Sequence, residues 1–467
     1  MVIQAQSAPA QAHTRRVSVA VAAAGLSSFA LLYAPQPVLP QLAAAFRLDP
    51  GSASLVIGVA TGALAVAVLP VAALAETVGR RRMIVWSVVV SAVLGLLLPL
   101  APSFPVLLVM RAVQGVAVAG FAGVAAAYLA DQVGVGRLAG AVGTMIAGNS
   151  VGGMMGRLGT GFAAGPLGWH GALAVVAGVA LACALFAALA LPRPPSPQHA
   201  PSPAHAPVPD AARVPGPGSA PDRAPVPAHD PAHDPAASGE PADEAHVERG
   251  RRAHSRAAHV RPGATWAARP STDSRPAGRR GAGVGVLVPC LVGALATGAF
   301  VALYNAAGFR LAGEPLSLSP AVASLVFLSY AMGTASSAAA GRLAARLGRT
   351  AALVTSLIVT VAGSALTLHP SLPATALGFA LLTAGFFAAH AIANAWVAAQ
   401  ASPQARGRAA GLYTLCFYLG SGAGGTAGTI VYGHAGWSWL IALTSAWLLL
   451  ATLAVLLVRG PAGAQNR

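Results

Sequence analysis

Residues 172–191 read ALAVVAGVALACALFAALAL, a run of apolar residues without a single charge. A helix of about 20 apolar residues spans the hydrocarbon core of a bilayer, where only helices and closed barrels satisfy every backbone group. The run lacks the alternation of apolar and polar residues that marks barrel strands. It therefore predicts a transmembrane helix, and comparable runs lie at Met83–Leu100 and Trp439–Val458.

The composition of the whole chain agrees with a membrane protein. The 467 residues are 55% hydrophobic and 9% charged, with a mean hydropathy of +0.66, whereas soluble domains carry about 25% charged residues. The formal net charge of +16 would suggest nucleic-acid binding in a soluble protein. In a membrane protein the accumulation of basic residues in cytoplasmic loops explains it better, so we expect a lipid bilayer and no nucleic acid as partner.

The apolar runs predict twelve membrane spans, and the fold class is therefore an all-α polytopic membrane protein. The spans are predicted at 17–39, 51–73, 83–102, 104–129, 138–163, 169–192, 284–309, 318–340, 350–368, 372–397, 407–432 and 436–458. An even number of spans places both ends of the chain on the same side of the membrane.

The arginines indicate which side that is. If the N-terminal tail, residues 1–16, is inside, the short inner segments hold thirteen arginines, and the outer loops hold only Arg47 and Arg310. The positive-inside rule then places both tails, 1–16 and 459–467, in the cytoplasm. We expect a multi-pass protein of the cytoplasmic membrane.

Residues 193–283 separate the sixth span from the seventh and differ from both. They are rich in Pro, Ala, Arg and His, as in PAHDPAHDP at 227–235, and hold too few large apolar residues to form a core. The segment is predicted to be a disordered cytoplasmic linker. Its scattered histidines leave a metal or partner site as the alternative, but no metal centre or cofactor is expected.

The linker divides the chain into two halves of six spans, 17–192 and 284–458, which resemble each other. AALAETVGRRRM at 72–83 aligns with GRLAARLGRTAA at 341–352. Glycines of the fifth span also align with glycines of the eleventh, and their spacing of four predicts helix faces that neighbouring helices approach closely. These packing glycines are Gly148, Gly152, Gly153 and Gly156, aligned with Gly420, Gly424, Gly425 and Gly428.

Two stretches of the chain, at 72–81 and 111–115, resemble signatures of the major facilitator superfamily. The superfamily's loop signature G-x-L-A-D-R-x-G-R-R corresponds here to Ala72, Leu74, Ala75, Glu76, Thr77, Gly79, Arg80 and Arg81, and its R-x-x-Q-G signature to Arg111, Gln114 and Gly115. Within the superfamily, GNSVGGMMGR at 148–157 and YLGSGAGGTAG at 418–428 are similar to the YnfM-type branch of bacterial efflux transporters. The resemblance implies two pseudo-symmetric six-helix bundles with the substrate bound between them.

The resemblance also implies a conformational gate in the loops after the second and eighth spans. Its residues would be Glu76, Gly79, Arg80 and Arg81 in the first half and Gly348 and Arg349 in the second. We expect Glu76 to pair with Arg80. The second half has Ala345 in the acidic place, so the latch is assigned to the first half only. The alternative is that these arginines only set the topology.

Polar residues within the spans are the candidates for substrate binding or coupling, because burial in a bilayer is costly for them. They are Arg111 and Gln114 in the fourth span, Asn149 and Arg157 in the fifth, Tyr33 and Gln36 in the first, Tyr304 and Asn305 in the seventh, and His390 and Asn394 in the tenth. Each has a structural alternative: Arg157 can snorkel to the interface, Asn149 can join two helices, and His390 can be a packing residue.

No aspartate or glutamate lies within a predicted span; outside the linker the only acids are Asp49, Glu76, Asp131 and Glu314. A lipophilic cation would need a negative partner in the membrane, so we expect a neutral or anionic small-molecule substrate such as a sugar or an organic acid. The expected function is a monomeric secondary transporter, an exporter coupled to protons by analogy, and not an enzyme, since P-loops and nucleophile elbows are missing from the sequence. The alternatives are drug efflux, an uncoupled facilitator, and a transporter-like sensor or scaffold.

Overall fold

The described part of the chain is built from helices. The computed structural model describes residues 8–133, 135–192, 281–401 and 406–458, and no strand occurs within these ranges. Residues 193–280 of the predicted linker and the predicted C-terminal tail, 459–467, lie outside the described residues. The all-α class predicted from the sequence is confirmed.

The first half contains seven α-helices and two short 3-10 helices among its described residues. They are α1 (Ala8–Tyr33), η1 (Gln36–Val38), α2 (Leu39–Phe46), α3 (Pro50–Val78), α4 (Arg80–Leu97), η2 (Leu98–Leu100), α5 (Phe104–Ala122), α6 (Ala125–Gln132) and α7 (Val135–Ala190). The start of α3 shows why these helices begin where they do. Asp49 accepts a hydrogen bond from the backbone N–H of Ser52, and Pro50 occupies the first helical position, which needs no backbone donor.

The second half repeats this plan. Its elements are α8 (Gly281–Ala312), α9 (Pro320–Ser324), η5 (Leu325–Ser329), α10 (Tyr330–Leu347), α11 (Arg349–Leu366), α12 (Leu372–Gln400), α13 (Arg406–Leu419), the π-helix η6 (Gly420–Gly424) and α14 (Gly425–Leu457). The start of α8 at Gly281 precedes the predicted end of the linker at 283, since the small apolar residues there continue the helix.

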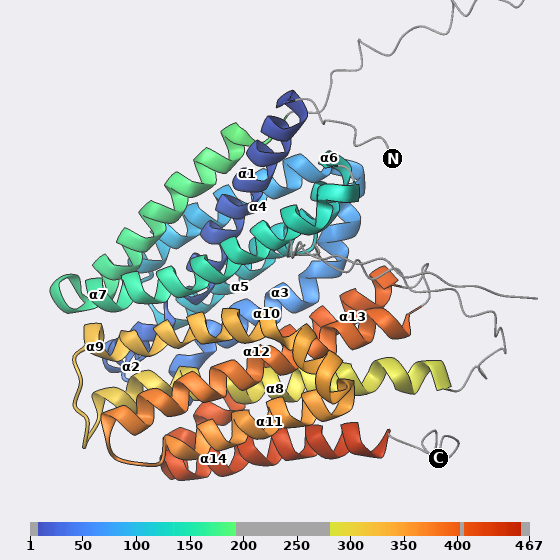
Figure 1. Cartoon of the computed structure of the whole chain (residues 1–467). Helices are drawn as coiled ribbons and strands as arrows, with labels where there is room; N and C mark the ends of the chain where they lie inside the picture. The colour runs from blue at the N-terminus through green and yellow to red at the C-terminus, as the bar shows by residue number, and fades with distance from the viewer. Residues whose placement is uncertain (1–7, 134, 193–280, 402–405, 459–467) are drawn as a thin grey trace, which may run out of the picture. The chain divides into compact units, whose positions relative to one another are not determined.

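Ten helical segments among the described residues are long and apolar enough to cross a membrane. Two of them, Gly140–Ala190 and Arg408–Leu457, are 51 and 50 residues long, which is length enough for two crossings each. Each bends at a glycine with positive φ, Gly168 at +63° and Gly436 at +80°, a region that side chains avoid. Figure 1 shows α7 turning back on itself at such a bend. If each of these two segments crosses twice, the ten segments give twelve crossings, and the number of crossings stays a prediction.

Equivalent helices of the two halves make equivalent contacts. In the first half α1 packs along α7, and in the second half α8 packs along η6 and α14. The turns between α3 and α4 and between α10 and α11 also match, because Gly79 and Gly348 both adopt positive φ, +99° and +79°. In Figure 1 the blue-to-green helices of the first half lie beside the yellow-to-red helices of the second.

The predicted packing glycines of the fifth span lie against the backbone of α1. A Cβ atom at Gly148, Gly152 or Gly156 would lie 2.4 Å from Ala22 O, 2.3 Å from Leu26 O, or 2.6 Å from Ala30 Cα. The second half repeats the arrangement, and a Cβ atom at Gly420, Gly424 or Gly428 would meet Ala294, Gly298 or Ala302 of α8. A Cβ atom at Gly425 would meet Val301 of α8, whereas Gly153 faces Arg157 and Tyr33.

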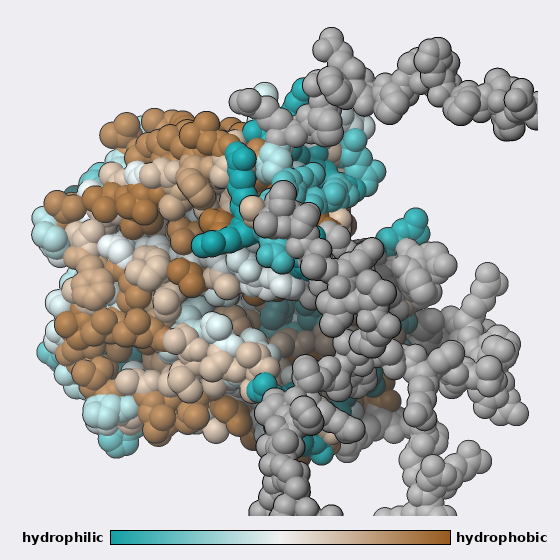
Figure 2. Space-filling view, turned by 45° about the horizontal axis from the view of Figure 1, so that its top comes forward, coloured by the Kyte–Doolittle hydropathy of each residue, from teal (hydrophilic) through white to brown (hydrophobic). Residues whose placement is uncertain are grey.

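The outer surface of the helices is apolar. Large hydrophobic side chains such as Trp86, Leu189 and Leu457 are exposed by 70%, 78% and 71%. Figure 2 shows broad hydrophobic areas over the helices, with hydrophilic residues gathered toward the periphery. A soluble protein rarely exposes so much apolar surface; lipid tails cover it in a multi-pass membrane protein.

Candidate functional site

A cavity of about 130 Å³ lies where the two halves meet. Helices α1 and α7 of the first half and α8, α10, α12 and α13 of the second provide its walls. The lining residues are Phe29, Tyr33, Asn149, Ser150, Gly153, Arg157, Thr297, Phe300, Val301, Tyr330, Thr334, Phe386, Phe387, His390 and Phe417. Four of the predicted candidates are therefore brought together in this central cavity: Tyr33, Asn149, Arg157 and His390.

A second cavity of about 660 Å³ continues the central cavity toward one end of the molecule. The two share residues such as Asn149, His390 and Phe417, and the second also reaches Gly143 near the start of α7 and Asn394 near the end of α12. Both residues lie toward the end of the helices where the gate arginines of the first half are found. Asn394 thus lines the route to the central cavity rather than the cavity itself.

Arg157 is the cation of the central cavity, and its side chain is 2% exposed. Nε donates to Gln36 Oε1 at 2.6 Å, and Nη1 donates to the carbonyl oxygen of Gly153 at 2.7 Å. The guanidinium carbon lies 4.1 Å from the ring centre of Tyr33 and 4.6 Å from that of Tyr330. Aromatic faces attract a cation without neutralising it, and no carboxylate pairs with Arg157 among the described residues.

The hydrogen bond on Arg157 continues into the other half of the molecule. Gln36 Nε2 donates to Asn305 Oδ1 at 2.7 Å, so three side chains form a chain from α7 through η1 to α8. Gln36 and Asn305 are 1% and 0% exposed. The two residues that the sequence proposed as separate candidates therefore bridge the halves at the closed end of the cavity.

Other close contacts hold the halves together on this side. A Cβ atom at Gly161 of α7 would lie 2.1 Å from the side chain of Ser324 in α9, and one at Gly51 of α3 would lie 2.5 Å from that of Ile430 in α14. The cavity is therefore closed beyond Arg157 and extends toward the opposite end, which carries Arg80.

Arg111 and Gln114 do not line this cavity. Arg111 is 0% exposed, and its guanidinium donates to Val56 O, Leu31 O and Leu32 O at 2.8, 3.2 and 2.6 Å and to Gln114 Oε1 at 2.5 Å. Gln114 Nε2 in turn donates to Ser91 O at 2.8 Å. These bonds join α5 to α1, α3 and α4, which gives the pair a structural position.

Tyr304 also lies outside the central cavity. Its hydroxyl shares hydrogen bonds with Ser329 and with Thr383, the latter at 2.7 Å, and its side chain is 1% exposed. Its ring packs on Phe300 and Phe379. Tyr304 thus connects α8, η5 and α12, which places it behind the cavity wall.

His390 faces both cavities from α12. Its Nδ1 shares a hydrogen bond with the hydroxyl of Tyr413 at 2.8 Å, and its ring lies 4.7 Å from Phe417 and 6.1 Å from Phe386. Asn149, on the other side, packs its Oδ1 over Gly25 of α1, and that oxygen has no hydrogen-bond partner among the described residues. Both residues line the central cavity.

In the predicted gate, the acidic residue that pairs with Arg80 is not the expected Glu76. Arg80 forms an ion pair with Asp131 at the end of α6, at 2.5 Å, and Glu76 is exposed and has no ion pair in the described part of the chain. The expected Glu76–Arg80 pair is corrected accordingly: the break at Gly123 and Val124 between α5 and α6 brings Asp131 to Arg80. Arg81 donates to the carbonyl oxygens of Ala188 and Leu191 at the end of α7.

In the second half an aromatic ring takes the place of the acid. The guanidinium carbon of Arg349 lies 4.5 Å from the ring centre of Trp396 in α12. Gly348 precedes it with positive φ, as Gly79 precedes Arg80. The loop geometry is thus shared between the halves, while the charge pair belongs to the first half.

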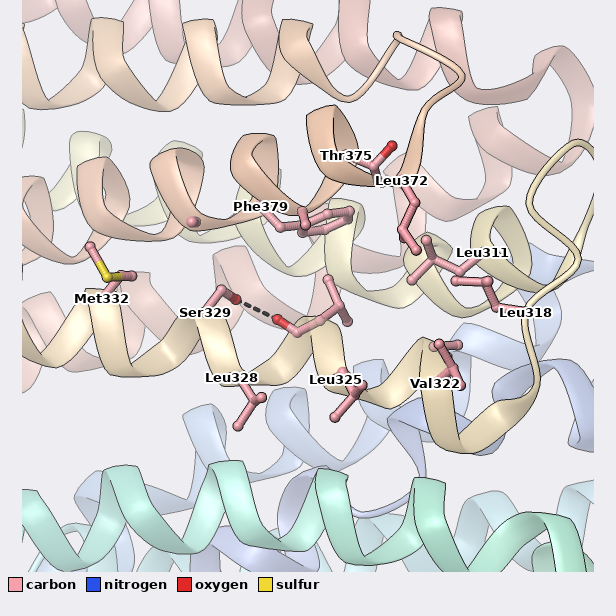
Figure 3. A pocket seen from close by; sticks show the side chains of 14 residues that line it. Leu311, Leu318, Val322, Leu325, Leu328, Ser329, Met332, Leu372, Thr375 and Phe379 are labelled. Atoms are coloured by element: carbon pink, nitrogen blue, oxygen red, sulfur yellow. Dashed lines mark hydrogen bonds between the residues drawn. The ribbon is translucent and has the colours of Figure 1, made fainter.

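A separate cavity of about 410 Å³ lies between α8, α10 and α12 and is lined almost entirely by apolar side chains. Figure 3 shows Phe379, Leu372 and Leu318 around it, with Ser329 as one of few polar residues. Leu325, Leu328 and Met332 of its wall are exposed by 42–50%. This groove therefore opens on the apolar outer surface, and its two hydroxyl side chains, Ser329 and Thr375, donate to the backbone carbonyl oxygens of Val326 and Ser371.

The sequence prediction missed the aromatic residues of the central cavity. Phe300, Phe386, Phe387, Phe417 and Tyr330 line it, but phenylalanines in a membrane helix look like lipid-facing or packing residues. A signal was available in α12, where Phe386, His390 and Asn394 follow each other at intervals of four and therefore share one helix face.

The chain matches a family model and curated proteins along most of its length. Residues 21–268 and 290–467 match the model of the Major Facilitator Superfamily. The chain is 31% identical over 438 residues to the inner membrane transport protein YnfM of Escherichia coli, covering 94% of this chain and 89% of that protein. It is 29% identical over 437 residues to the MFS-type transporter YybF of Bacillus subtilis, covering 94% and 92%.

Solved structures share the fold at low sequence identity. A bacterial homologue of the human lysosomal transporter Spinster, in an inward-facing and occupied conformation, superposes with a TM-score of 0.68 at 15% identity, over 97% of both chains. The nucleoside transporter NupG, as its D323A mutant, gives a TM-score of 0.62 at 13% identity, over 95% of this chain and all of that one. At such identities the likeness extends to the fold alone.

Proposed function

The chain belongs to the major facilitator superfamily, as its motifs indicated, and we propose that it exports a neutral or anionic organic solute from a bacterial cell in exchange for protons. As a member of this superfamily it is a multi-pass membrane transporter and not an enzyme. The direction of transport, the coupling and the class of solute are the proposed parts.

The observation that carries the proposal is a cavity between the halves that is closed at one end and holds a cation without a carboxylate. Gln36 and Asn305 bridge the halves beyond Arg157, while the cavity extends toward the end with Arg80. Rocking of two similar halves about a site between them exposes that site to each side in turn. The arginine-rich end is assigned to the cytoplasm by the positive-inside rule, so this conformation is open inward.

His390 is the proposed proton carrier. Histidine changes charge near neutral pH, and His390 lines the cavity within hydrogen-bonding reach of Tyr413. No aspartate or glutamate is among the residues that line the central cavity or the cavity that continues it. A histidine at the cavity wall would exchange its proton with whichever side the cavity faces.

Transport into proteoliposomes with and without a pH gradient tests this proposal. The full chain is reconstituted, and solute movement is measured together with internal pH for a panel of sugars, polyols and organic acids. We expect a solute of the panel to move against its gradient when a pH gradient is imposed, and His390→Gln to remove that dependence. His434→Gln, which changes an exposed histidine, is the matched control. Full pH dependence in His390→Gln would exclude the assigned role.

An uncoupled facilitator is a second candidate, favoured by the lack of acids in the spans. In that case the same solute would move only down its own gradient, and the pH gradient would have no effect on the wild-type protein. The experiment therefore separates the two candidates directly.

A further inference from the structure

We propose that the central cavity selects an amphipathic organic anion whose negative group binds Arg157 and whose aromatic body lies against the phenylalanines of the second half. This inference rests on the proposed function, since it names the class of solute for the same cavity. Its basis is the unequal chemistry of the two walls.

The wall from the first half supplies the charge. An arginine side chain has five N–H donors, and protein oxygens accept from two of those of Arg157, at Nε and Nη1. The remaining donors, including both on Nη2, have no partner among the described residues. The guanidinium carbon lies 4.1 Å from the ring centre of Tyr33 and 4.6 Å from that of Tyr330. The planar fork that remains matches a carboxylate or sulfonate group.

Comparison with Arg111 shows that this arrangement is not the only way to bury an arginine in this protein. The guanidinium of Arg111 is surrounded by four oxygen acceptors and touches no cavity described above. A buried charge without an ion-pair partner is costly in free energy. Arg157 lines the cavity and has no such partner among the described residues. A bound anion would offset it.

The wall from the second half is mainly aromatic, and its polar residues are Thr297, Thr334 and His390. Phe300 of α8 stacks on Phe386 of α12 with 4.0 Å between ring centres, and Phe387 meets both rings edge-on. Phe417 of α13 extends the wall beside His390. Aromatic rings bind planar apolar bodies by offset stacking and edge-to-face contacts. They offer no acceptor or donor to a hydroxyl group.

The two walls together discriminate between classes of solute. A sugar would turn several hydroxyls toward the phenyl rings, and a hydroxyl that loses water without gaining a partner costs free energy. A lipophilic cation would suit the rings but would meet Arg157 at close range. An anion with an aromatic body satisfies both walls and contacts both halves at once.

Equilibrium dialysis of the purified full chain in detergent, at pH 7.5, tests the inference with three probes. They are naphthalene-2-sulfonate, its neutral analogue naphthalene-2-sulfonamide, and gluconate, an anion without an aromatic body. We expect the sulfonate to bind at least about tenfold more tightly than either other probe, which corresponds to about 1.4 kcal/mol. Arg157→Gln should abolish its advantage over the sulfonamide and leave the sulfonamide within about twofold.

Further variants separate loss of charge from loss of fold. Arg157→Lys should retain the preference for the sulfonate, and Phe386→Ala should weaken both naphthalene probes by about tenfold while leaving gluconate unchanged. Arg310→Gln, which removes an arginine outside the central cavity, is the matched control and should bind as the wild type does. Binding of gluconate as tight as that of the sulfonate, absence of sulfonate binding, or a preference that survives Arg157→Gln would overturn the inference.

The failure of this inference can be told apart from failure of the proposed function. If proteoliposomes move gluconate or a neutral sugar under a pH gradient, the transport proposal stands and the aromatic anion is excluded as the preferred class. If the sulfonate binds as expected but neither the sulfonate nor any solute of the panel moves in proteoliposomes, the binding site stands and the transport proposal fails.

Discussion

Arg111 and Arg157 are both buried in apolar helices, but their contacts in the structure differ. Arg111 donates to three backbone carbonyls and to Gln114, whereas Arg157 donates to Gln36 and Gly153 and faces a cavity. Both lie in apolar helices, so the sequence proposed both as substrate residues. The structure assigns the cavity position to Arg157 alone.

The position of Arg111 predicts a loss of stability on substitution. Arg111→Gln would remove the donor to the carbonyl oxygens of Leu31 and Leu32 at the end of α1, and each unpaired buried group costs about 1–3 kcal/mol. We expect a large fall in the melting temperature measured by size-exclusion chromatography of heated detergent extracts. The melting temperature of Arg157→Gln should fall much less, because this substitution also removes a buried charge that has no ion-pair partner. Equal melting temperatures for wild type and Arg111→Gln would contradict this assignment.

At the scale of elements, the glycine face of α7 sets how closely α1 approaches. A side chain at Gly152 would collide with the backbone of Leu26, whereas at Gly178, further along α7, the space around a Cβ atom is open. Gly152→Leu should therefore abolish transport and lower the yield of folded protein, while Gly178→Leu should leave both near wild-type values. Transport rates normalised to the amount of monodisperse protein provide the comparison; normal transport by Gly152→Leu would exclude the packing role.

The ion pair between α4 and α6 makes a prediction that differs from the one made from the motif. Arg80 pairs with Asp131, and Glu76 is exposed without an ion pair in the described ranges. Because the two side chains are 33% and 50% exposed, solvent limits the pair to about 1 kcal/mol or less. Asp131→Asn should shift the populations of inward-open and outward-open states by a few-fold, measured by single-molecule fluorescence between labelled helices.

Glu76→Gln is the matched control for Asp131→Asn, since it removes the same charge from the same end of the molecule. We expect it to leave the populations unchanged. An equal shift in both variants would mean that the net charge of this end, rather than the ion pair, determines the equilibrium.

At the scale of the whole molecule, the two halves are in contact on the far side of Arg157 from the central cavity. Toward the end that carries Arg80, a cavity lies between them. Gln36 and Asn305 form the polar contact between them. Gln36→Ala removes this contact and one partner of Arg157, so we expect a larger outward-open population. Electron paramagnetic resonance distances between spin labels on α2 and α8 should lengthen in this variant. Ser52→Ala, which changes a hydrogen bond within the first half only, should leave the distances unchanged.

The aromatic cavity also belongs to this scale, because neither half contains it alone. Arg157 and Tyr33 come from the first half, and Phe300 and Phe386 come from the second. A solute that contacts both walls would favour conformations in which the halves are close. Differential affinity for two states is what allows a ligand to shift a conformational equilibrium.

The sequence by itself determined the all-α membrane fold, the family and the internal repeat. Apolar runs such as 172–191 permit little but a membrane helix, because a bilayer leaves the backbone few ways to satisfy its hydrogen bonds. Gly79 and Gly348, or Gly152 and Gly424, align in sequence because local backbone geometry and close helix contact both require a glycine. Such constraints act on individual positions and can be read one residue at a time.

The tertiary structure alone decided which polar residues face one another. Arg80 pairs with Asp131 because a break between α5 and α6 directs the end of α6 toward it. Arg111 is structural because carbonyl oxygens of two other helices accept from its guanidinium. The phenylalanines of α8 and α12 face the central cavity rather than lipid because of how the second half packs against the first. These outcomes depend on contacts between segments far apart in sequence, whose energies no single segment encodes.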